Sequence, residues 1–159
     1  MIRDLASRLS RYKVDAVCGP LTGGAFVALL VANELSSEFY YSEQVAAIPS
    51  DDLLSVRYRL PAVLREKLQG RRVAIVNDVT SVGSAVRGTL ADLEACQARV
   101  VAIGSLLVLG STINSFALSK GVAIETLATA DQNLWDPVAC PLCKAGVPVV
   151  TPSYGASVR

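Results

Sequence analysis

Histidine is absent from this chain of 159 residues, which excludes the commonest general base and the commonest zinc ligand. An excess of charge of either sign is lacking too, because the formal net charge is only +1. Composition therefore makes no case for binding nucleic acid or an acidic surface. The sequence shows no helix-turn-helix pattern and no basic helix face, so we expect no nucleic-acid partner.

Long apolar runs are also missing. None approaches the roughly 18 residues of a membrane span, and no charged-then-apolar leader opens the chain, so we expect no membrane association. Four cysteines without a secretory signal indicate reduced thiols and a cytoplasmic location. Hydrophobic residues are abundant at 52%, more than a monomer of this size needs, which predicts a homodimer.

The length suits one domain with a good core. We therefore expect residues 1–159 to form a single domain, with a loop-rich tail over about 134–159 packed on the body.

The most informative stretch begins with Val73 to Val76, a run rich in β-branched residues that is typical of a strand buried on both faces. Asn77 and Asp78 stand at its carboxyl end. A turn of small residues follows, and then a helix marked by apolar Val86, Leu90 and Leu93. Free amides and the helix dipole favour a phosphate at such a helix start. An acid just before the turn is placed for hydroxyls beside the phosphate, such as those of ribose.

A second unit of the same kind lies earlier in the chain. Residues 14–18 predict a strand, which we expect Gly19-Pro20 to break. The loop Leu21-Thr22-Gly23-Gly24 then leads into an almost wholly apolar helix beginning over 25–32, which should be buried on all sides. The glycine pair alone is a weak signal, because tight packing of helix on strand explains it as often as ligand binding.

The remaining pattern alternates helices and strands. Further helices are predicted over 2–12, 61–68 and 112–119, and further strands over 38–41 (alone or in a hairpin with 45–47), 56–61, 100–109 and 122–127, with a polar loop over 49–55. This order predicts an α/β fold, a doubly wound domain around a central parallel sheet. Ligands of such sheets bind at the carboxyl ends of the strands, where both glycine turns lie.

Residues 73–85 resemble the phosphoribosyl-pyrophosphate (PRPP) signature of type I phosphoribosyltransferases, and the chain as a whole, over about 2–148, is closest to the orotate phosphoribosyltransferases. Asp78, Ser81, Gly83 and Ser84 fit the signature, whereas Asn77 and Val82 replace its usual acid and hydroxyl residues. The resemblance implies a Rossmann-like fold with a reduced hood. It also implies transfer of the ribose 5-phosphate group of PRPP to a nucleobase, orotate first, with release of pyrophosphate.

The same resemblance implies roles for individual residues. Asp78, with Asn77 beside it, would hold the ribose, and Mg²⁺ would be held through PRPP rather than directly by the protein. The 5′-phosphate would bind Thr80, Ser81, Val82, Gly83, Ser84 and Ala85, and the pyrophosphate Leu21, Thr22, Gly23 and Gly24. Arg57 or Arg59 would clamp the pyrophosphate, since Gln44 stands where the family carries a lysine; a solvated edge strand explains these arginines equally well. No general base is assigned.

The departures keep two alternatives open. An amide at position 77 replaces a charge-assisted hydrogen bond of about 1.5–3 kcal/mol by a neutral one of about 0.5–1.5 kcal/mol, which is a several-fold weaker grip. Together with Gln44, this favours a non-catalytic PRPP-binding or regulatory homologue as the alternative. A purine phosphoribosyltransferase is the third. We also expect this chain to lack the amino-terminal segment that contacts the pyrimidine in orotate enzymes.

The tail carries a Cys-x-x-Cys pair, Cys140 and Cys143. Structural zinc needs four ligands, and the remaining cysteines, Cys18 and Cys96, belong to a predicted buried strand and a helix end. A redox pair would be expected to open a helix after the first strand, which this pair does not. The tail resembles the ending of certain bacterial orotate phosphoribosyltransferases, and we expect it to be structural packing.

Overall fold

The computed structural model describes residues 1–45, 56–136 and 138–148. Six strands form one sheet in the order β3-β2-β1-β4-β5-β6. They are β1 (Ala16–Pro20), β2 (Glu38–Gln44), β3 (Tyr58–Arg59), β4 (Arg72–Thr80), β5 (Arg99–Leu109) and β6 (Ala123–Ala130). Neighbouring strands are parallel, except that β3 pairs antiparallel with β2 at one edge. The predicted α/β fold with a central parallel sheet is therefore confirmed.

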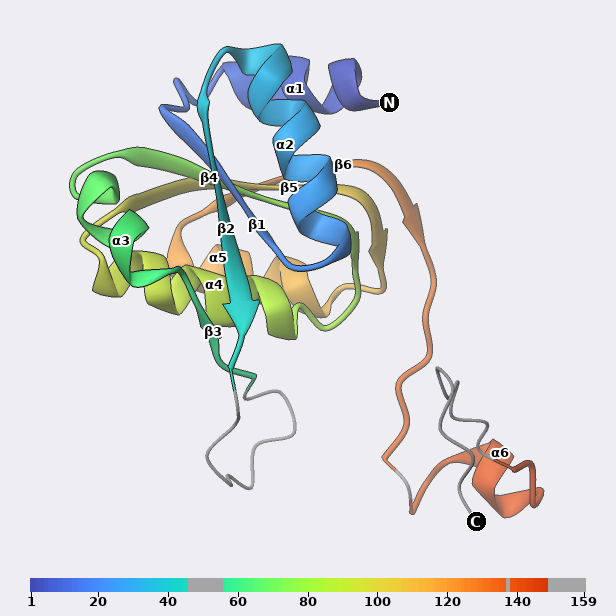
Figure 1. The fold of residues 1–159 in the computed structure, drawn as a ribbon. Coiled ribbons are helices and arrows are strands. Elements are labelled where there is room, and N and C mark those ends of the chain that lie inside the picture. Colours follow the sequence, from blue (N-terminus) through green and yellow to red (C-terminus); the bar gives the residue numbers. More distant parts are fainter. Residues whose placement is uncertain (46–55, 137, 149–159) are drawn as a thin grey trace.

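Helices cover both faces of the sheet (Figure 1). On one face lie α1 (Ile2–Ser10) and α2 (Gly23–Leu35), and on the other α4 (Ser84–Ala95) and α5 (Thr112–Lys120). A short α3 (Ala62–Arg65), the 3-10 turn η1 (Glu66–Leu68) and α6 (Pro141–Lys144) complete the described elements. No helix of the described residues is long and apolar enough to cross a bilayer.

Apolar spacing explains why each helix docks as it does. In α1, Leu5 and Leu9 lie one turn apart and are fully buried against the sheet. In α4, the predicted stripe is buried as expected, since Val86, Leu90 and Leu93 are at most 1% exposed. Two cores result, one on each face of the sheet, and the strands between them consist mostly of buried β-branched and small residues.

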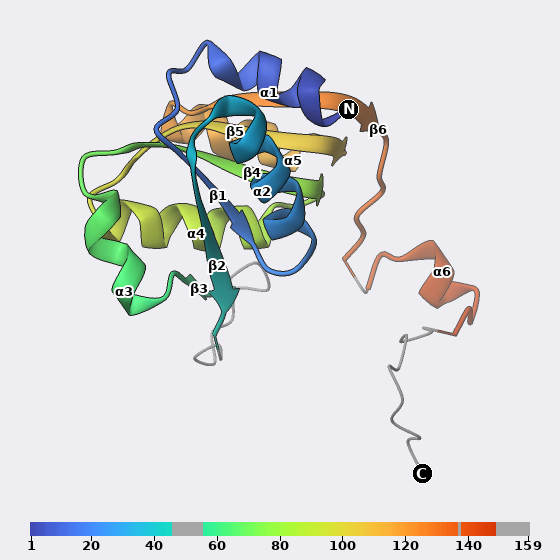
Figure 2. The same ribbon diagram turned by 45° about the horizontal axis from the view of Figure 1, so that its top comes forward.

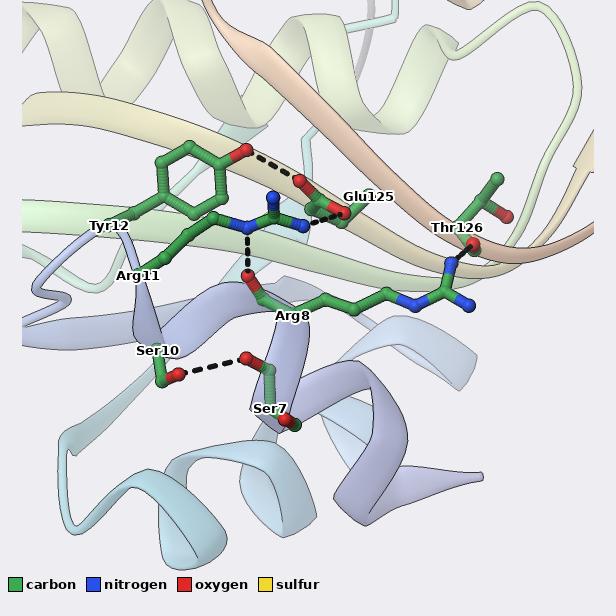
Figure 3. A network of polar contacts seen from close by, with 7 residues as sticks. All are labelled: Ser7, Arg8, Ser10, Arg11, Tyr12, Glu125 and Thr126. Atoms are coloured by element: carbon green, nitrogen blue, oxygen red, sulfur yellow. Dashed lines mark hydrogen bonds and ion pairs between the residues drawn. The ribbon is translucent and has the colours of Figure 1, made fainter.

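The loop after α1 is tied to the far edge of the sheet by polar contacts (Figure 3). The hydroxyl of Tyr12 donates to a carboxylate oxygen of Glu125 on β6 at 2.5 Å, and Arg11 forms an ion pair with the other oxygen at 3.0 Å. Arg8 donates to the backbone carbonyl of Thr126. The hydrogen bond to Glu125 and burial raise the pKa of Tyr12. These contacts fix β6, an edge strand, against the amino-terminal helix.

Several predicted boundaries were wrong. Gly19 and Pro20 continue β1 instead of ending it, because both pair with β2. The pairing of β1 with β4 stops at Cys18, before Pro20, which has no backbone N–H to donate. The strand over 38–41 extends to Gln44, so no hairpin turn lies at Ser42-Glu43. The strand predicted over 56–61 is only Tyr58–Arg59. The predicted polar loop over 49–55 and residues 46–47 of the hairpin lie outside the described residues.

Helix α2 is not buried on all sides, contrary to the expectation from its apolar composition. Ala28 and Val31 face the sheet and are fully buried, whereas Phe26 and Leu30 are 65% and 52% exposed. The reason is architectural, because the sheet covers one side of α2 and α1 another, and nothing in the described chain covers the rest. The outward face of α2, with Leu29 between these two residues, is therefore an uncovered apolar surface.

The described part of the tail does not pack on the body, contrary to expectation. Residues 131–136, 138–139 and 141–148 are all exposed, and Cys140 is half-buried. Leu134 and Trp135 lie largely in solvent because β6 ends at the edge of the sheet, and the following chain runs away from it. Both views show α6 separated from the body at the end of an extended arm (Figures 1 and 2).

Candidate active site

The two glycine turns meet at the carboxyl edge of the sheet. Strand β1 leads to β2 through α2, and β4 leads to β5 through α4, so the chain leaves these adjacent strands toward opposite faces. A doubly wound sheet opens its ligand crevice at such a switch point. The register Ala16↔Val73 and Cys18↔Ile75 brings the ends of β1 and β4 together.

Contact between the turns is close enough to require glycine. A Cβ atom on Gly23 would lie 2.1 Å from Oδ2 of Asp78, and one on Gly24 would lie 2.4 Å from Oδ1 of Asn77. Both distances are far below van der Waals contact, so any larger residue would displace the acid or the amide. The glycine pair, which is only a weak signal in the sequence, thus packs directly against Asn77 and Asp78.

Asn77 and Asp78 differ in the environment of their side chains. The amide nitrogen of Asn77 donates to the carbonyl of Val79 at 2.8 Å and reaches the hydroxyl of Thr80 at 3.4 Å. Asn77 is only 8% exposed. A carboxylate at this position has no proton to donate to the Val79 carbonyl. The amide that departs from the family signature therefore stabilises the turn from within.

Asp78 is half-buried and more accessible than Asn77. In the described part of the chain, its carboxylate forms no hydrogen bond or ion pair, while its backbone carbonyl accepts a hydrogen bond from Ser105 of β5 at 3.2 Å. Ser105, which is buried, also lies 3.1 Å from the hydroxyl of Thr80 and donates to the carbonyl of Leu107 at 2.9 Å. The strand end is thus held rigidly, with the carboxylate left available for a ligand.

The turn after β4 has the geometry of an anion site. Gly83 is the N-cap of α4 with φ +82°, a conformation natural only to glycine, and no side chain caps the helix. The first backbone N–H groups of α4 consequently face the turn without an intrahelical partner. Arg87 braces the turn by donating to the carbonyl of Val82 at 3.1 Å, with its guanidinium 4.1 Å from the ring centre of Phe116.

The individual residues of the predicted 5′-phosphate turn are placed differently. Ser81, Val82, Ser84 and Ala85 are half-buried at the turn, whereas Thr80 is 1% exposed and its hydroxyl belongs to the internal network with Asn77 and Ser105. Ser81 is hydrogen-bonded to Gln132, in the segment after β6. Thr80 therefore stabilises the turn through buried hydrogen bonds, and the other residues line the turn.

The predicted pyrophosphate loop lies at the start of α2. Leu21 and Thr22 are exposed, the peptide bond between them is cis, and the N–H of Leu21 donates to the carbonyl of Ser42 on β2 at 2.8 Å. Thr22 is the N-cap of α2, and no side chain caps that helix either. Two uncapped helix starts, those of α2 and α4, thus flank Asp78.

Arg57 and Arg59 are placed beside α4, with no described contact to Gly23 or Gly24. Both are exposed, and with Arg87, Gly88 and Phe116 they line a cavity of about 510 Å³ along the outer side of α4. The structure therefore brings together the two turns and Asp78 but does not join these arginines to them.

A cleft that the sequence interpretation missed adjoins the turn predicted to bind the 5′-phosphate. It has a volume of about 1080 Å³ and lies at the carboxyl ends of β5 and β6, where Ser81 reaches Gln132. Its lining is polar and contains Gly110, Ser111, Thr112, Asn114, Asp131, Gln132 and Asn133. The signal was present as a third small-residue turn, Gly110-Ser111-Thr112, after a long apolar strand.

The residues present fit a Mg²⁺ ion held mainly through a substrate. The Asp78 carboxylate offers the hard oxygen that Mg²⁺ prefers, and among the described residues it forms no hydrogen bond or ion pair that would compete for it. In residues 1–45, 56–136 and 138–148, no three potential ligands among His, Cys, Asp and Glu cluster together. Water and phosphate oxygens would complete the shell, as is usual for Mg²⁺.

Comparisons with known proteins agree with this geometry. A family model described as a phosphoribosyl transferase domain matches residues 1–144. The chain is 30% identical over 149 residues to the orotate phosphoribosyltransferase of Thermotoga maritima, spanning 94% of this chain and 72% of the relative. It is 31% identical over 153 residues to that of Desulforamulus reducens, spanning 96% and 72%.

Solved structures share the fold at lower identity. The orotate phosphoribosyltransferase of Aeropyrum pernix aligns with a TM-score of 0.61 and 22% identity over 80% of this chain and 69% of that one. The adenine phosphoribosyltransferase of Thermoanaerobacter pseudethanolicus aligns with a TM-score of 0.65 and 24% identity over 81% and 77%. At these identities the likeness concerns the fold.

Proposed function

Because this chain belongs to the phosphoribosyltransferase family, a family of glycosyltransferases, we propose that it transfers the ribose 5-phosphate group of PRPP to orotate and releases pyrophosphate. The resemblance seen in the sequence is confirmed at the level of the family. The observation that carries the proposal is the contact of Gly23 and Gly24 with Asp78 and Asn77, which gathers both uncapped helix starts around one carboxylate.

Each part of PRPP has a matching group. The N–H groups at the start of α4, with Ser81 and Ser84, would hold the 5′-phosphate, and those at the start of α2 the pyrophosphate. Asp78 would accept hydrogen bonds from the ribose hydroxyls, which lie between the two phosphate groups. Mg²⁺ would neutralise charge on the leaving pyrophosphate. The protein then acts by position and electrostatics, which needs no histidine.

The acceptor base would enter through the cleft at the ends of β5 and β6. Asn114, Gln132 and Asn133 carry amides suited to the edge of a planar base, and Ser81 links this cleft to the phosphate turn. Orotate is our first choice because the relatives at about 30% identity carry that name.

A neutral base, such as a purine, is the second candidate for one specific reason. The described residues that line the cleft include Asp131 but no lysine or arginine, whereas orotate is an anion that a cation would hold. A third candidate is a homologue that binds PRPP without turnover, favoured by the inward orientation of Asn77.

We further propose a homodimer formed through the uncovered face of α2. Leu21 of the proposed pyrophosphate loop lines one apolar hollow together with Phe26 and Leu29, and Leu30 is exposed on the same helix. Burying this face would shield it from water. A cytoplasmic location accords with four cysteines that are all free thiols.

One experiment tests the three candidate functions together. The purified protein is titrated with PRPP and Mg²⁺ by calorimetry and then incubated with orotate, adenine, guanine or hypoxanthine while nucleotide products are measured. Formation of orotidine phosphate supports the first proposal, and a purine nucleotide supports the second. PRPP binding without any product supports the non-catalytic homologue, and no binding refutes all three.

A further inference from the structure

The tail presents two thiols in a fixed local arrangement. Cys140 is the N-cap of α6, and its sulfur accepts a hydrogen bond from the backbone N–H of Cys143 at 3.5 Å. Pro141 opens the short turn, and Gly146 beyond it has φ +69°. Both thiols are free, with Cys140 half-buried and Cys143 exposed. The two sulfurs are thus held on the same small loop and open to solvent.

This arrangement is one half of a tetrahedral thiolate site. Two cysteines separated by two residues supply a pair of ligands in structural zinc sites, which take four in all. A backbone N–H that donates to a sulfur stabilises the thiolate form and orients it, as the groups behind a metal ligand do. Cys140 already has such a donor before any metal is present.

The described chain cannot complete the set of four. It has no histidine, and its other cysteines are buried in the body, Cys18 fully and Cys96 to 9% exposure. Nowhere in the described ranges do three potential ligands lie together. The arm that carries α6 also holds it away from the body (Figures 1 and 2).

We propose that Cys140 and Cys143 of two copies of this chain together bind one Zn²⁺ ion. Each copy contributes two thiolates, and the four thiols release four protons to solvent as the metal binds. The exposed arm makes this meeting possible, because Gln132 at its start is hydrogen-bonded to Ser81 of the body, whereas residues 133–136 and 138–139 form no hydrogen bond to the described body. The inference does not depend on the proposed transferase chemistry.

Native mass spectrometry of the full chain, purified under reducing conditions and supplied with Zn²⁺, tests the stoichiometry. The expected result is one zinc per two chains, absent from monomers. Replacing Zn²⁺ by Co²⁺ should give the visible spectrum of tetrahedral cobalt with thiolate charge-transfer bands. One metal per monomer, or no retained metal, would overturn the proposal.

Four variants make the assignment specific. Cys140→Ser and Cys143→Ser should each lower zinc retention at least ten-fold, whereas the control Cys96→Ala, which removes a thiol of the body, should retain one zinc per two chains. In mixed dimers of the wild type with the double variant, only two thiols remain, and zinc should be lost. Retention in these mixed dimers, or in both single variants, would show that the metal lies elsewhere.

Discussion

Gly23 and Asp78 are packed so tightly in the candidate site that no side chain fits between the glycine Cα and the carboxylate. A Cβ on Gly23 would fall 2.1 Å from Oδ2 of Asp78. The two residues come from turns that are far apart in the sequence, and each limits what the other position can be. This relationship connects the proposed pyrophosphate loop to the proposed ribose-binding acid, and it supplies the sharpest variants.

Asp78→Asn should weaken PRPP binding with little change in stability. The carboxylate forms no hydrogen bond in the described chain, so its removal leaves no internal partner unsatisfied. Replacing a charge-assisted hydrogen bond of about 1.5–3 kcal/mol by a neutral one of about 0.5–1.5 kcal/mol corresponds to several-fold weaker binding. Calorimetry with PRPP and Mg²⁺ measures this, with Asp136→Asn in the tail as the matched control. Unchanged binding in Asp78→Asn would place the site elsewhere.

Gly23→Ala and Gly24→Ala should separate binding from folding. In Gly23→Ala the new methyl meets only the end of the Asp78 side chain, which can rotate away, so PRPP binding should fall at least ten-fold while the melting temperature changes little. In Gly24→Ala the methyl meets Asn77 and the ring of Pro20 at 2.8 Å, so we expect a loss of about 1–3 kcal/mol of stability. Thermal unfolding and calorimetry on both variants provide the comparison. Equal destabilisation of the two would contradict the assigned contacts.

Asn77→Asp, which restores the family acid, should destabilise the protein. The introduced carboxylate cannot donate to the carbonyl of Val79, and a buried polar group left in this state costs about 1–3 kcal/mol. Burial raises the pKa of such a carboxyl, so stability should fall as the pH rises from about 4 through that raised pKa. Urea unfolding at pH 4 and pH 7 measures the difference from the wild type. A gain in turnover despite this loss would identify Asn77 as a limit on catalysis.

Ionisation of Tyr40 should make the free energy of unfolding depend on pH in the alkaline range. Burial and the hydrogen bond that its hydroxyl donates to Glu38 raise the pKa of Tyr40 to about 12, from a usual value of 10.0. The unfolded chain therefore loses this proton first, and stability should fall as the pH rises from 10 toward 12. Tyr40→Phe should flatten that decline, while Tyr41→Phe on the same strand should keep it. Denaturant unfolding across this range measures the slopes, and identical slopes in all three proteins would refute the assignment.

Phe26→Asp should produce a monomer if α2 forms the proposed dimer interface. Phe26 is 65% exposed in the single chain, so a charge there is harmless to the monomer but costly in an apolar interface. Leu118→Asp is the matched control, because Leu118 is 82% exposed on α5, on the opposite face of the sheet. Sedimentation velocity distinguishes the two. The measurement is made with a metal chelator present, so that the proposed zinc site cannot join two chains, and a dimer that then survives Phe26→Asp would place the interface elsewhere.

Local patterns predicted most of this fold because each element carries its own periodicity. The stripe of Val86, Leu90 and Leu93 and the strand from Val73 to Val76 lie where expected. The end of β1 was missed because Gly19 and Pro20 are local breakers that pairing with β2 overrides. Exposure of Phe26 was missed because composition does not tell how many sides of a helix a sheet can cover.

The candidate site was predicted in its parts but not in its assembly. Asp78 and the two glycine turns were identifiable from residue types at strand ends, whereas the contact of Gly23 with Asp78 follows only from the order of strands in the sheet. The inward orientation of Asn77 depends on the carbonyl of Val79, a backbone group that has no signature in the sequence. The polar cleft at Gln132 and Asn133 required the neighbouring ends of β5 and β6.

The pairing of β1 with β4 also has a consequence for the order of folding. Ala16 and Val73 are neighbours in the sheet but distant along the chain, so the contact between them closes a long loop and forms slowly compared with the local helices. Neither turn acquires its partner before this closure. A nascent or truncated chain that ends before β4 therefore lacks the complete candidate site, and under the proposed function recovery of PRPP binding during refolding should coincide with the final, global folding phase.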